Sequence, residues 1–276
     1  MPRFVARIGF AVLASAGAWW LAAAPVSAQS FSTQIIDAKS NLFGAGRSGT
    51  APDPGGNGGG ILPPVFSLTA GSGRVLTFMS VTGSASYNND VGDPNRGQFN
   101  GPDGGFVNYP PANTDGFNTA INSYDGISGL QLIETATANR RVMFLAGVFL
   151  DDSVPAGTAP PRLDFSSTAL GTGFPSLSPL LNQTFFIGDG LTATGSGLQQ
   201  QFSVPDAATR LFLGFIDGAD FQGDPTFYGN NDGSFVATFS VVPEPTTLAL
   251  GIAILPLGLL AARRLRRPRC ECEAGW

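Results

Sequence analysis

Residues 209–241 read TRLFLGFIDGADFQGDPTFYGNNDGSFVATFSV, and this stretch decides the fold class of the chain. Both sets of alternate residues are apolar in 211–216, which predicts a strand that is buried on both faces and central in its sheet. In 234–242 apolar residues alternate less strictly with Ser and Thr, which predicts a strand with one wetter face. The Asp-, Asn- and Gly-rich segment between them is typical of loops and turns. We therefore expect two strands joined by a long polar loop.

The same pattern recurs along the body of the chain. Short segments rich in β-branched and aromatic residues, bounded by Gly, Pro, Asn and Asp, predict further strands at 74–82, 129–135, 140–150, 183–188 and 198–205. Gly- and Pro-rich stretches predict long loops, the first of them mobile, at 44–64, 88–118 and 151–180. Together these segments predict an all-β domain over 29–242, an antiparallel β-sandwich of jelly-roll or Greek-key type.

The first 28 residues predict a secretory signal peptide that is cleaved from the mature chain. Arg3 and Arg7 precede an apolar stretch, which closes on the small-residue cleavage pattern VSA at 26–28. The mature chain is then expected to start near Gln29, and an uncleaved N-terminal membrane anchor is the alternative.

The C-terminal region has three parts in a fixed order. The triplet Pro243-Glu244-Pro245 is followed by an apolar run at 246–262, which predicts a short transmembrane helix, and then by an arginine cluster that begins with Arg263 and Arg264. This region, 243–269, closely resembles the PEP-CTERM sorting signal of Gram-negative bacteria. The resemblance implies export, transient anchoring in the inner membrane, processing near the triplet by an exosortase, and a final place at the cell surface or in the extracellular exopolysaccharide matrix. A plain single-span membrane protein is the alternative.

Composition narrows the possible chemistry. The two cysteines lie in the tail, 270–276, so the body has no disulfide, thiol nucleophile or thiolate metal site. The chain has no histidine, which excludes Ser-His-Asp catalysis and the usual zinc sites. We expect no enzyme; the remaining enzymatic alternative is an Asp-based glycosidase, because Glu134 is the only glutamate of the body. The motif GAGRSG at 44–49 follows no strand and precedes no helix, so it predicts a loop rather than a dinucleotide site.

The charge of the body points to an oxygen-liganded cation. Residues 29–242 hold eight basic and seventeen acidic side chains, a net charge of −9. This balance argues against a nucleic-acid partner, which needs a basic patch to neutralise phosphates. It suits calcium, whose protein ligands are carboxylate, amide and carbonyl oxygens.

The turn YGNNDGSF at 228–235 is the candidate binding site. Two strands that leave the same end of a sandwich would bring Asp217, Asn230 and Asn231 to one spot, and the flanking glycines permit tight bending. Asn supplies a neutral oxygen, so several amides can surround a cation with little like-charge repulsion. The alternative is a β-turn in which the amides bond only to the backbone.

Three pieces of the chain resemble the galactose-binding calcium lectins of the PA-IL type, within the wider galactose-binding-like β-sandwich group. The pieces are 202–217, 227–241 and 73–87; the strand at 140–150 fits more loosely. The resemblance implies a calcium site in which Asp217 gives a carboxylate and Asn230 and Asn231 give amide oxygens. It implies further ligands in the backbone carbonyls of Tyr87 and Phe227.

The chain departs from this family in two ways. The loop after Asp217 is longer and contains Asp220 and Asp224, either of which could replace Asp217 as ligand. The family also places a histidine beside the sugar, and this chain has none. The resemblance nevertheless implies a calcium-dependent, lectin-like module that binds a galactose-like carbohydrate. The alternative is a non-catalytic structural protein of the matrix or cell surface that binds no sugar.

Overall fold

The computed structural model describes residues 29–32, 35–94, 96–108, 120–131, 133–134 and 139–243. These residues form 18 strands and three short 3-10 helices, so the predicted all-β class is confirmed. Within these ranges, no helix is long and apolar enough to cross a membrane. The predicted signal peptide and the apolar run at 246–262 lie outside the described residues.

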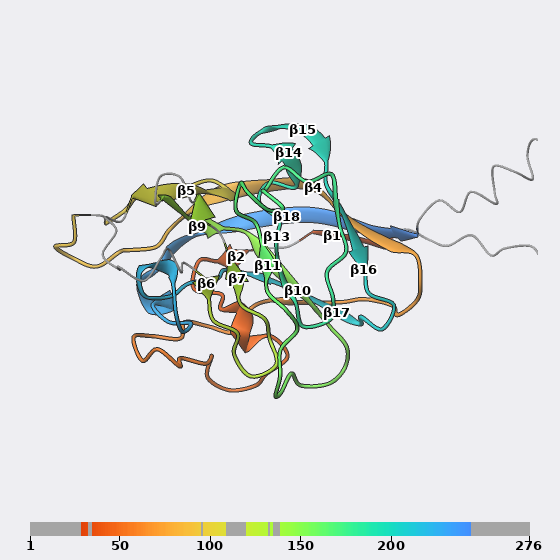
Figure 1. The fold of residues 1–276 in the computed structure, drawn as a ribbon, viewed down its shortest axis with the longest axis horizontal. Coiled ribbons are helices and arrows are strands. Elements are labelled where there is room, and N and C mark those ends of the chain that lie inside the picture. The colour runs from red at the N-terminus through yellow and green to blue at the C-terminus, as the bar shows by residue number, and fades with distance from the viewer. Residues whose placement is uncertain are drawn as a thin grey trace, which may run out of the picture.

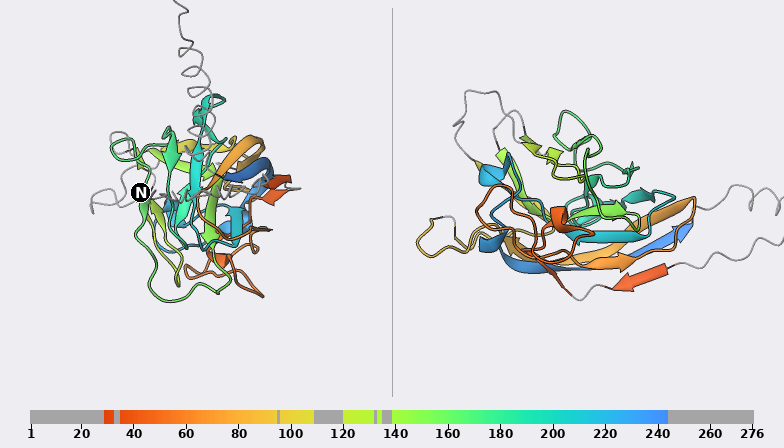
Figure 2. Two further views of the ribbon diagram at one scale, coloured as in Figure 1. Left: turned by 90° about the vertical axis from the view of Figure 1, so that its right-hand side faces the viewer. Right: turned by 90° about the horizontal axis from the view of Figure 1, so that it is seen from below.

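A large sheet of six strands forms one side of the molecule (Figures 1 and 2). Its order is β1-β18-β4-β16-β12, with β2 also paired to β18, and only the β12–β16 pair is parallel. The central pair is long and antiparallel, with Asp232 opposite Ser86 at one end and Pro243 opposite Arg74 at the other. The six strands are β1 (Gln29–Ser32), β2 (Ile36–Asp37), β4 (Arg74–Ser86), β12 (Ser176–Leu177), β16 (Gln201–Val204) and β18 (Asp232–Pro243).

A second sheet of four strands faces the large sheet. Its order is β13-β10-β17-β3, and all its pairs are antiparallel. The strand predicted from the apolar run at 211–216 is central here, because β17 lies between β10 and β3. The strands are β3 (Val65–Ser67), β10 (Ala146–Leu150), β13 (Thr184–Phe186) and β17 (Arg210–Gly214).

Phenylalanine pairs join the two sheets and form the centre of the core. Phe66 of β3 meets Phe239 of β18 edge to face, with ring centroids 5.2 Å apart. Phe185 meets Phe202 with tilted rings, and Phe215 stacks on Phe235, at centroid distances of 5.2 and 5.3 Å. Along β18 the residues that face this core, Phe235, Ala237, Phe239 and Val241, are buried, and their neighbours are more exposed. The two-residue alternation predicted for this strand is therefore confirmed.

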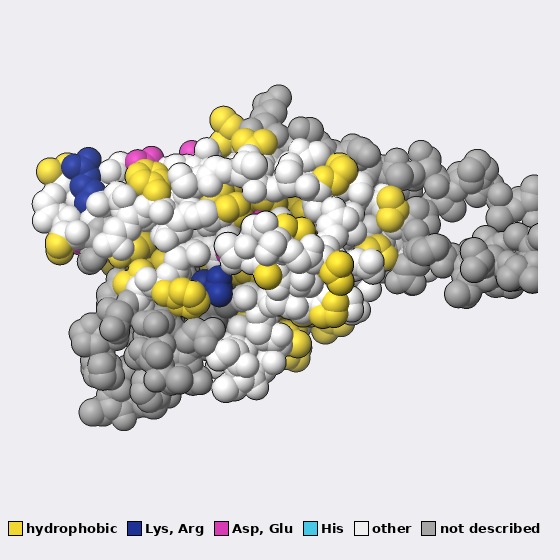
Figure 3. All heavy atoms as spheres, turned by 90° about the horizontal axis from the view of Figure 1, so that it is seen from above, with side chains coloured by type: hydrophobic (Ala, Val, Ile, Leu, Met, Phe, Trp, Pro, Cys, Tyr) yellow, Lys and Arg dark blue, Asp and Glu magenta, His cyan; other side chains and the backbone are white. Residues whose placement is uncertain are grey.

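Three small sheets complete the fold. They are β5-β9-β8, β11-β7-β6 and the hairpin β14-β15. On the face shown in Figure 3, charged side chains are sparse and hydrophobic ones are scattered. The strands are β5 (Asp103–Asn108), β6 (Ala120–Ile121), β7 (Leu130–Gln131), β8 (Ile133–Glu134), β9 (Asn139–Phe144), β11 (Leu163–Asp164), β14 (Leu191–Ala193) and β15 (Ser196–Gln199).

The predicted loops contain more order than their composition indicates. Residues 88–118 include strand β5, and 151–180 include β11 and β12. Hydrogen bonds fasten the loop at 44–64, for which the sequence predicts mobility. The Asp53 carboxylate accepts from the N–H groups of Gly56 and Gly58 and from the Thr226 hydroxyl, while the Asn41 amide donates to two carbonyls of the loop. Glycine lets the backbone approach these donors and acceptors closely.

Candidate functional site

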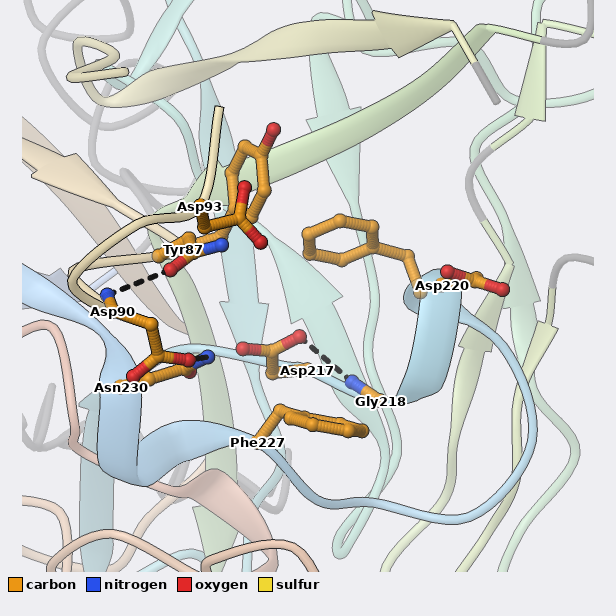
Figure 4. Close-up of a pocket in the computed structure, with 10 residues that line it drawn as sticks. Tyr87, Asp90, Asp93, Asp217, Gly218, Asp220, Phe227 and Asn230 are labelled. Carbon is orange, nitrogen blue, oxygen red and sulfur yellow. Dashed lines mark hydrogen bonds between the residues drawn. The ribbon is translucent and has the colours of Figure 1, made fainter. Parts of the chain in front are cut away.

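A pocket of about 180 Å³ lies where three segments meet at one end of the molecule (Figure 4). The first segment follows β4, the second follows β17 and includes helix η2 (Ala219–Phe221), and the third includes η3 (Tyr228–Asn230) and leads into β18. The lining residues are Tyr87, Asn88, Asp90, Asp93, Asp217, Gly218, Asp220, Phe221, Phe227 and Asn230.

Strand pairing explains why these segments converge. Ser86 lies opposite Asp232, so the residues just after β4 lie beside the residues just before β18. The two ends of the loop after β17 lie side by side, because Gly218 forms an isolated β-bridge with Pro225. The buried Tyr228 hydroxyl then accepts a hydrogen bond of 3.0 Å from the Asp217 N–H. Sheet register and one closed loop thus bring together residues far apart in the chain.

Asp217 is a buried carboxylate that is only partly satisfied. The residue is 2 % exposed, and its Oδ1 accepts from the Gly218 N–H at 2.8 Å. Its Oδ2 is buried and has no hydrogen-bond partner among the residues that the structure describes. Burial raises the pKa of Asp217 to about 7, although the Asn231 side chain and the Gly218 N–H act to lower it. A buried acceptor without a donor costs about 1–3 kcal/mol, and more when it is charged.

Asn230 and Asn231 each use the amide nitrogen and leave the amide oxygen unpaired. The Asn230 Nδ2 donates to Asp90 Oδ2 at 3.1 Å, and the Asn231 Nδ2 donates to the Ala38 carbonyl at 3.1 Å. Both partners are acceptors, so they fix which end of each amide carries the nitrogen. The Oδ1 atoms of both residues are buried without a partner. With Asp217 Oδ2, three buried oxygens are therefore left without donors at the predicted site.

The rim of the pocket is acidic and aromatic. Asp90, Asp93 and Asp220 line it, and the lining includes no lysine or arginine. Tyr87 and Phe221 pack edge to face across it, with centroids 5.3 Å apart. Burial, followed by the charge of Asp93, raises the pKa of the Tyr87 hydroxyl. The pocket therefore favours cations over anions.

Three residues of the lining have left-handed backbone conformations. The φ angles of Asp220, Phe221 and Phe227 are 52°, 57° and 67°. This region is uncommon for residues other than glycine, and strained conformations gather at binding sites. We expected Gly229 and Gly233 to supply the bending of the turn. Gly233 does have a positive φ, but Phe227 rather than Gly229 adopts the left-handed conformation before η3.

Most of the predicted ligands lie together. Tyr87, Asp217, Phe227 and Asn230 all line the pocket, and the Asn231 side chain, outside the lining, interacts with Asp217. The two aspartates predicted as alternatives to Asp217 lie in different places. Asp220 lines the pocket, whereas Asp224 is exposed outside the lining and accepts from the Asn122 amide at 2.9 Å. Of the sorting residues, Pro243 ends β18, and Glu244, Pro245, Arg263 and Arg264 lie outside the described residues.

Sequence reasoning missed half of the lining: Asn88, Asp90, Asp93, Gly218 and Phe221. One signal could have identified the first of these. The sequence YNND at 87–90 repeats the Tyr, Asn and Asp content of YGNND at 228–232. The two stretches lie side by side, and the Asn89 N–H donates to the Asn230 carbonyl at 2.8 Å.

The residues present fit calcium better than a metal held by several charged groups. No group of three or more His, Cys, Asp or Glu side chains is placed to hold a metal among the residues that the structure describes. The site instead offers one buried carboxylate oxygen, two buried amide oxygens and the acidic rim. Mixed carboxylate and amide oxygens are the donor set of calcium. The observation behind this comparison is the set of three buried acceptors that lack donors among the described residues.

Comparison of the chain with protein-family models, curated proteins and solved structures gave no match, so function is inferred from the sequence and the pocket geometry.

Proposed function

We propose that the chain is an exported, non-catalytic surface or matrix protein that binds calcium in this pocket and, through the calcium site, a carbohydrate. The observation that supports calcium is the set of unpartnered buried oxygens of Asp217, Asn230 and Asn231. A cation bound among these residues would give their oxygens the partner that they lack, which water can do only with suitable further partners. Asp90, Asp93 and Asp220 at the rim would add long-range attraction.

The proposal also includes the finer fold and the cellular route. The facing sheets and their mainly antiparallel pairs support a jelly-roll or Greek-key sandwich. The signal peptide, the PEP triplet and the arginine cluster support export, transient anchoring in the inner membrane, processing by an exosortase and display at the surface or in the matrix.

Carbohydrate is the proposed second ligand. Calcium accepts neutral hydroxyl oxygens readily, and the half-buried Phe227 in the lining offers an apolar surface for a sugar ring. The resemblance to galactose-binding calcium lectins supports a galactose-like sugar. The second candidate function is structural, because Asn230 joins two loops through its bonds to Asn89 and Asp90, and calcium there would stiffen both.

Calcium binding is tested by a thermal melt of residues 29–243 with calcium and with chelator. At a hundredfold excess over Kd, calcium should add about 2.7 kcal/mol to the free energy of unfolding, a Tm rise of about 5–10 °C. Asp217→Ala and Asn230→Ala should abolish this rise. Asp224→Ala is the matched control and should retain it, because this carboxylate lies outside the pocket lining. An unchanged Tm in the parent protein would refute the calcium proposal.

A glycan array separates the two functions once calcium binding is established. The lectin function predicts that the protein binds particular glycans of the array in calcium. This binding should be lost in chelator and in the Asp217→Ala variant. Calcium-dependent stabilisation with an array that remains blank would favour the structural function.

A further inference from the structure

One of the two long central strands of the large sheet connects the pocket to the predicted membrane anchor. β18 begins at Asp232, directly after the Asn230–Asn231 pair, and ends at Pro243, the first residue of the predicted sorting triplet. Its 12 residues span about 35–40 Å at about 3.3 Å per residue. Figure 1 shows the start of β18 at the left end of the molecule and its arrowhead at the right end.

The N-terminal strand places the other predicted membrane segment at the same end. β1 begins at Gln29, which lies opposite Val241, two residues before the end of β18. The signal peptide at 1–28 and the apolar run at 246–262 are therefore attached at one end of the body. Insertion of either segment into a bilayer holds this end against the membrane.

We propose that the pocket is carried at the membrane-distal end of the body and takes its ligand in trans. The ligand would then be a saccharide polymer of the surrounding matrix rather than a headgroup of the anchoring membrane. This inference rests on the proposed function for the nature of the ligand and for the C-terminal anchor. The acidic rim formed by Asp90, Asp93 and Asp220 agrees with it, because these side chains repel anionic lipid headgroups.

The orientation can be measured without calcium or sugar. The full chain with Cys270→Ser and Cys272→Ser is placed in vesicles of phosphatidylcholine and phosphatidylglycerol that carry an acceptor dye in the bilayer. A donor dye is attached through Val91→Cys or Ser72→Cys. Both positions are exposed and outside the pocket lining; Val91 lies beyond the pocket end of β4, and Ser72 precedes its other end.

Energy transfer to the bilayer should be strong from position 72 and weak from position 91. Equal transfer, or stronger transfer from position 91, would overturn the inference. Calcium affinity measured on the same vesicles keeps the two proposals apart. If calcium does not bind but energy transfer is still stronger from position 72 than from position 91, only the proposed function is contradicted. If calcium binds but energy transfer is stronger from position 91, only the orientation is contradicted.

Discussion

Asp217 concentrates the electrostatic cost of the pocket in one side chain. It follows a strand that is fully embedded in the second sheet, so its carboxylate enters the protein interior together with the apolar residues before it. One oxygen is satisfied by the next N–H along the chain, and the other has no partner. A residue with only a turn-forming role would gain nothing from this burial. In the proposed function, a bound cation would offset this cost.

We expect the calcium-free protein to lose stability as pH rises from about 4 to about 7. The pKa of Asp217 is about 7 when folded and near 3.8 when unfolded, so in this range the folded state binds more protons. Protonated Asp217 supports the fold, and its contribution is lost as pH rises through 7. Urea titrations at pH 4.5 and 7.5 in chelator measure the effect. Asp217→Asn should remove this component and Asp224→Asn should retain it; identical pH slopes in the two variants would contradict the assignment.

The second residue of β18 is a glycine that leaves little room for a side chain. Gly233 has a φ of 91°, and an added Cβ would lie 2.3 Å from the Ser84 carbonyl oxygen. We expect Gly233→Ala to lower the free energy of unfolding by about 2 kcal/mol or more, measured by urea denaturation. Gly229→Ala is the control, because its added Cβ would meet only Gly58, at 3.8 Å. A Gly233→Ala protein that is as stable as the Gly229→Ala control would show that β18 accommodates a side chain at position 233.

Calcium should also protect the loop between β4 and β5 from proteolysis. This loop is held to the turn before β18 by the bonds of Asn230 to Asn89 and Asp90. Arg96 is exposed in the loop and offers a trypsin site. We expect cleavage after Arg96 to slow in calcium, because coordination of Asn230 would fix the turn to which the loop is attached. Arg162, exposed elsewhere and outside the pocket lining, is the internal control, and equal calcium effects at both arginines would contradict the coupling.

The long strands could be predicted from sequence, and the short ones could not. β4, β17 and β18 carry alternating or doubly apolar patterns over many residues, so the hydrophobic effect alone specifies them. Two-residue strands such as β6, β11 and β12 contain too little pattern, and their pairing depends on neighbours in space. The same limit applies to the pocket. Asp217 and Asn230 stand out by turn chemistry, whereas the choice of Asp90 and Asp93 among the aspartates of 88–118 depends on the register of Ser86 against Asp232.

The whole molecule relies on aromatic packing between sheets rather than on covalent bracing. Both cysteines lie in the tail, and the chain has 22 phenylalanines, several of which meet across the two facing sheets. If the body is exported as proposed, this packing would have to keep it folded outside the cell without a disulfide. The pocket loops also contribute to this core, through the buried Tyr87, Phe221 and Tyr228.

We expect the surface form of the protein to begin near Gln29 and to end close to the PEP triplet. Intact-mass spectrometry of protein released from producing cells measures both ends. Replacement of the triplet at 243–245 by three alanines should leave the chain in the membrane fraction with its C-terminal segment retained. A parent chain that keeps residues beyond 262 at the surface would instead indicate a plain single-span anchor.

The antiparallel partnership of β18 with β4 has a mechanical consequence. A pull between a ligand held at the pocket and an anchor beyond Pro243 acts along the axis of β18. Its hydrogen bonds to β4 lie across that axis, and β1 and β2 add further bonds on the other side. The force then acts on many of these hydrogen bonds at the same time, in shear. Peeling β18 away from one end would instead break the bonds one after another. The strand that connects the pocket to the predicted anchor is thus also well placed to bear tension between them.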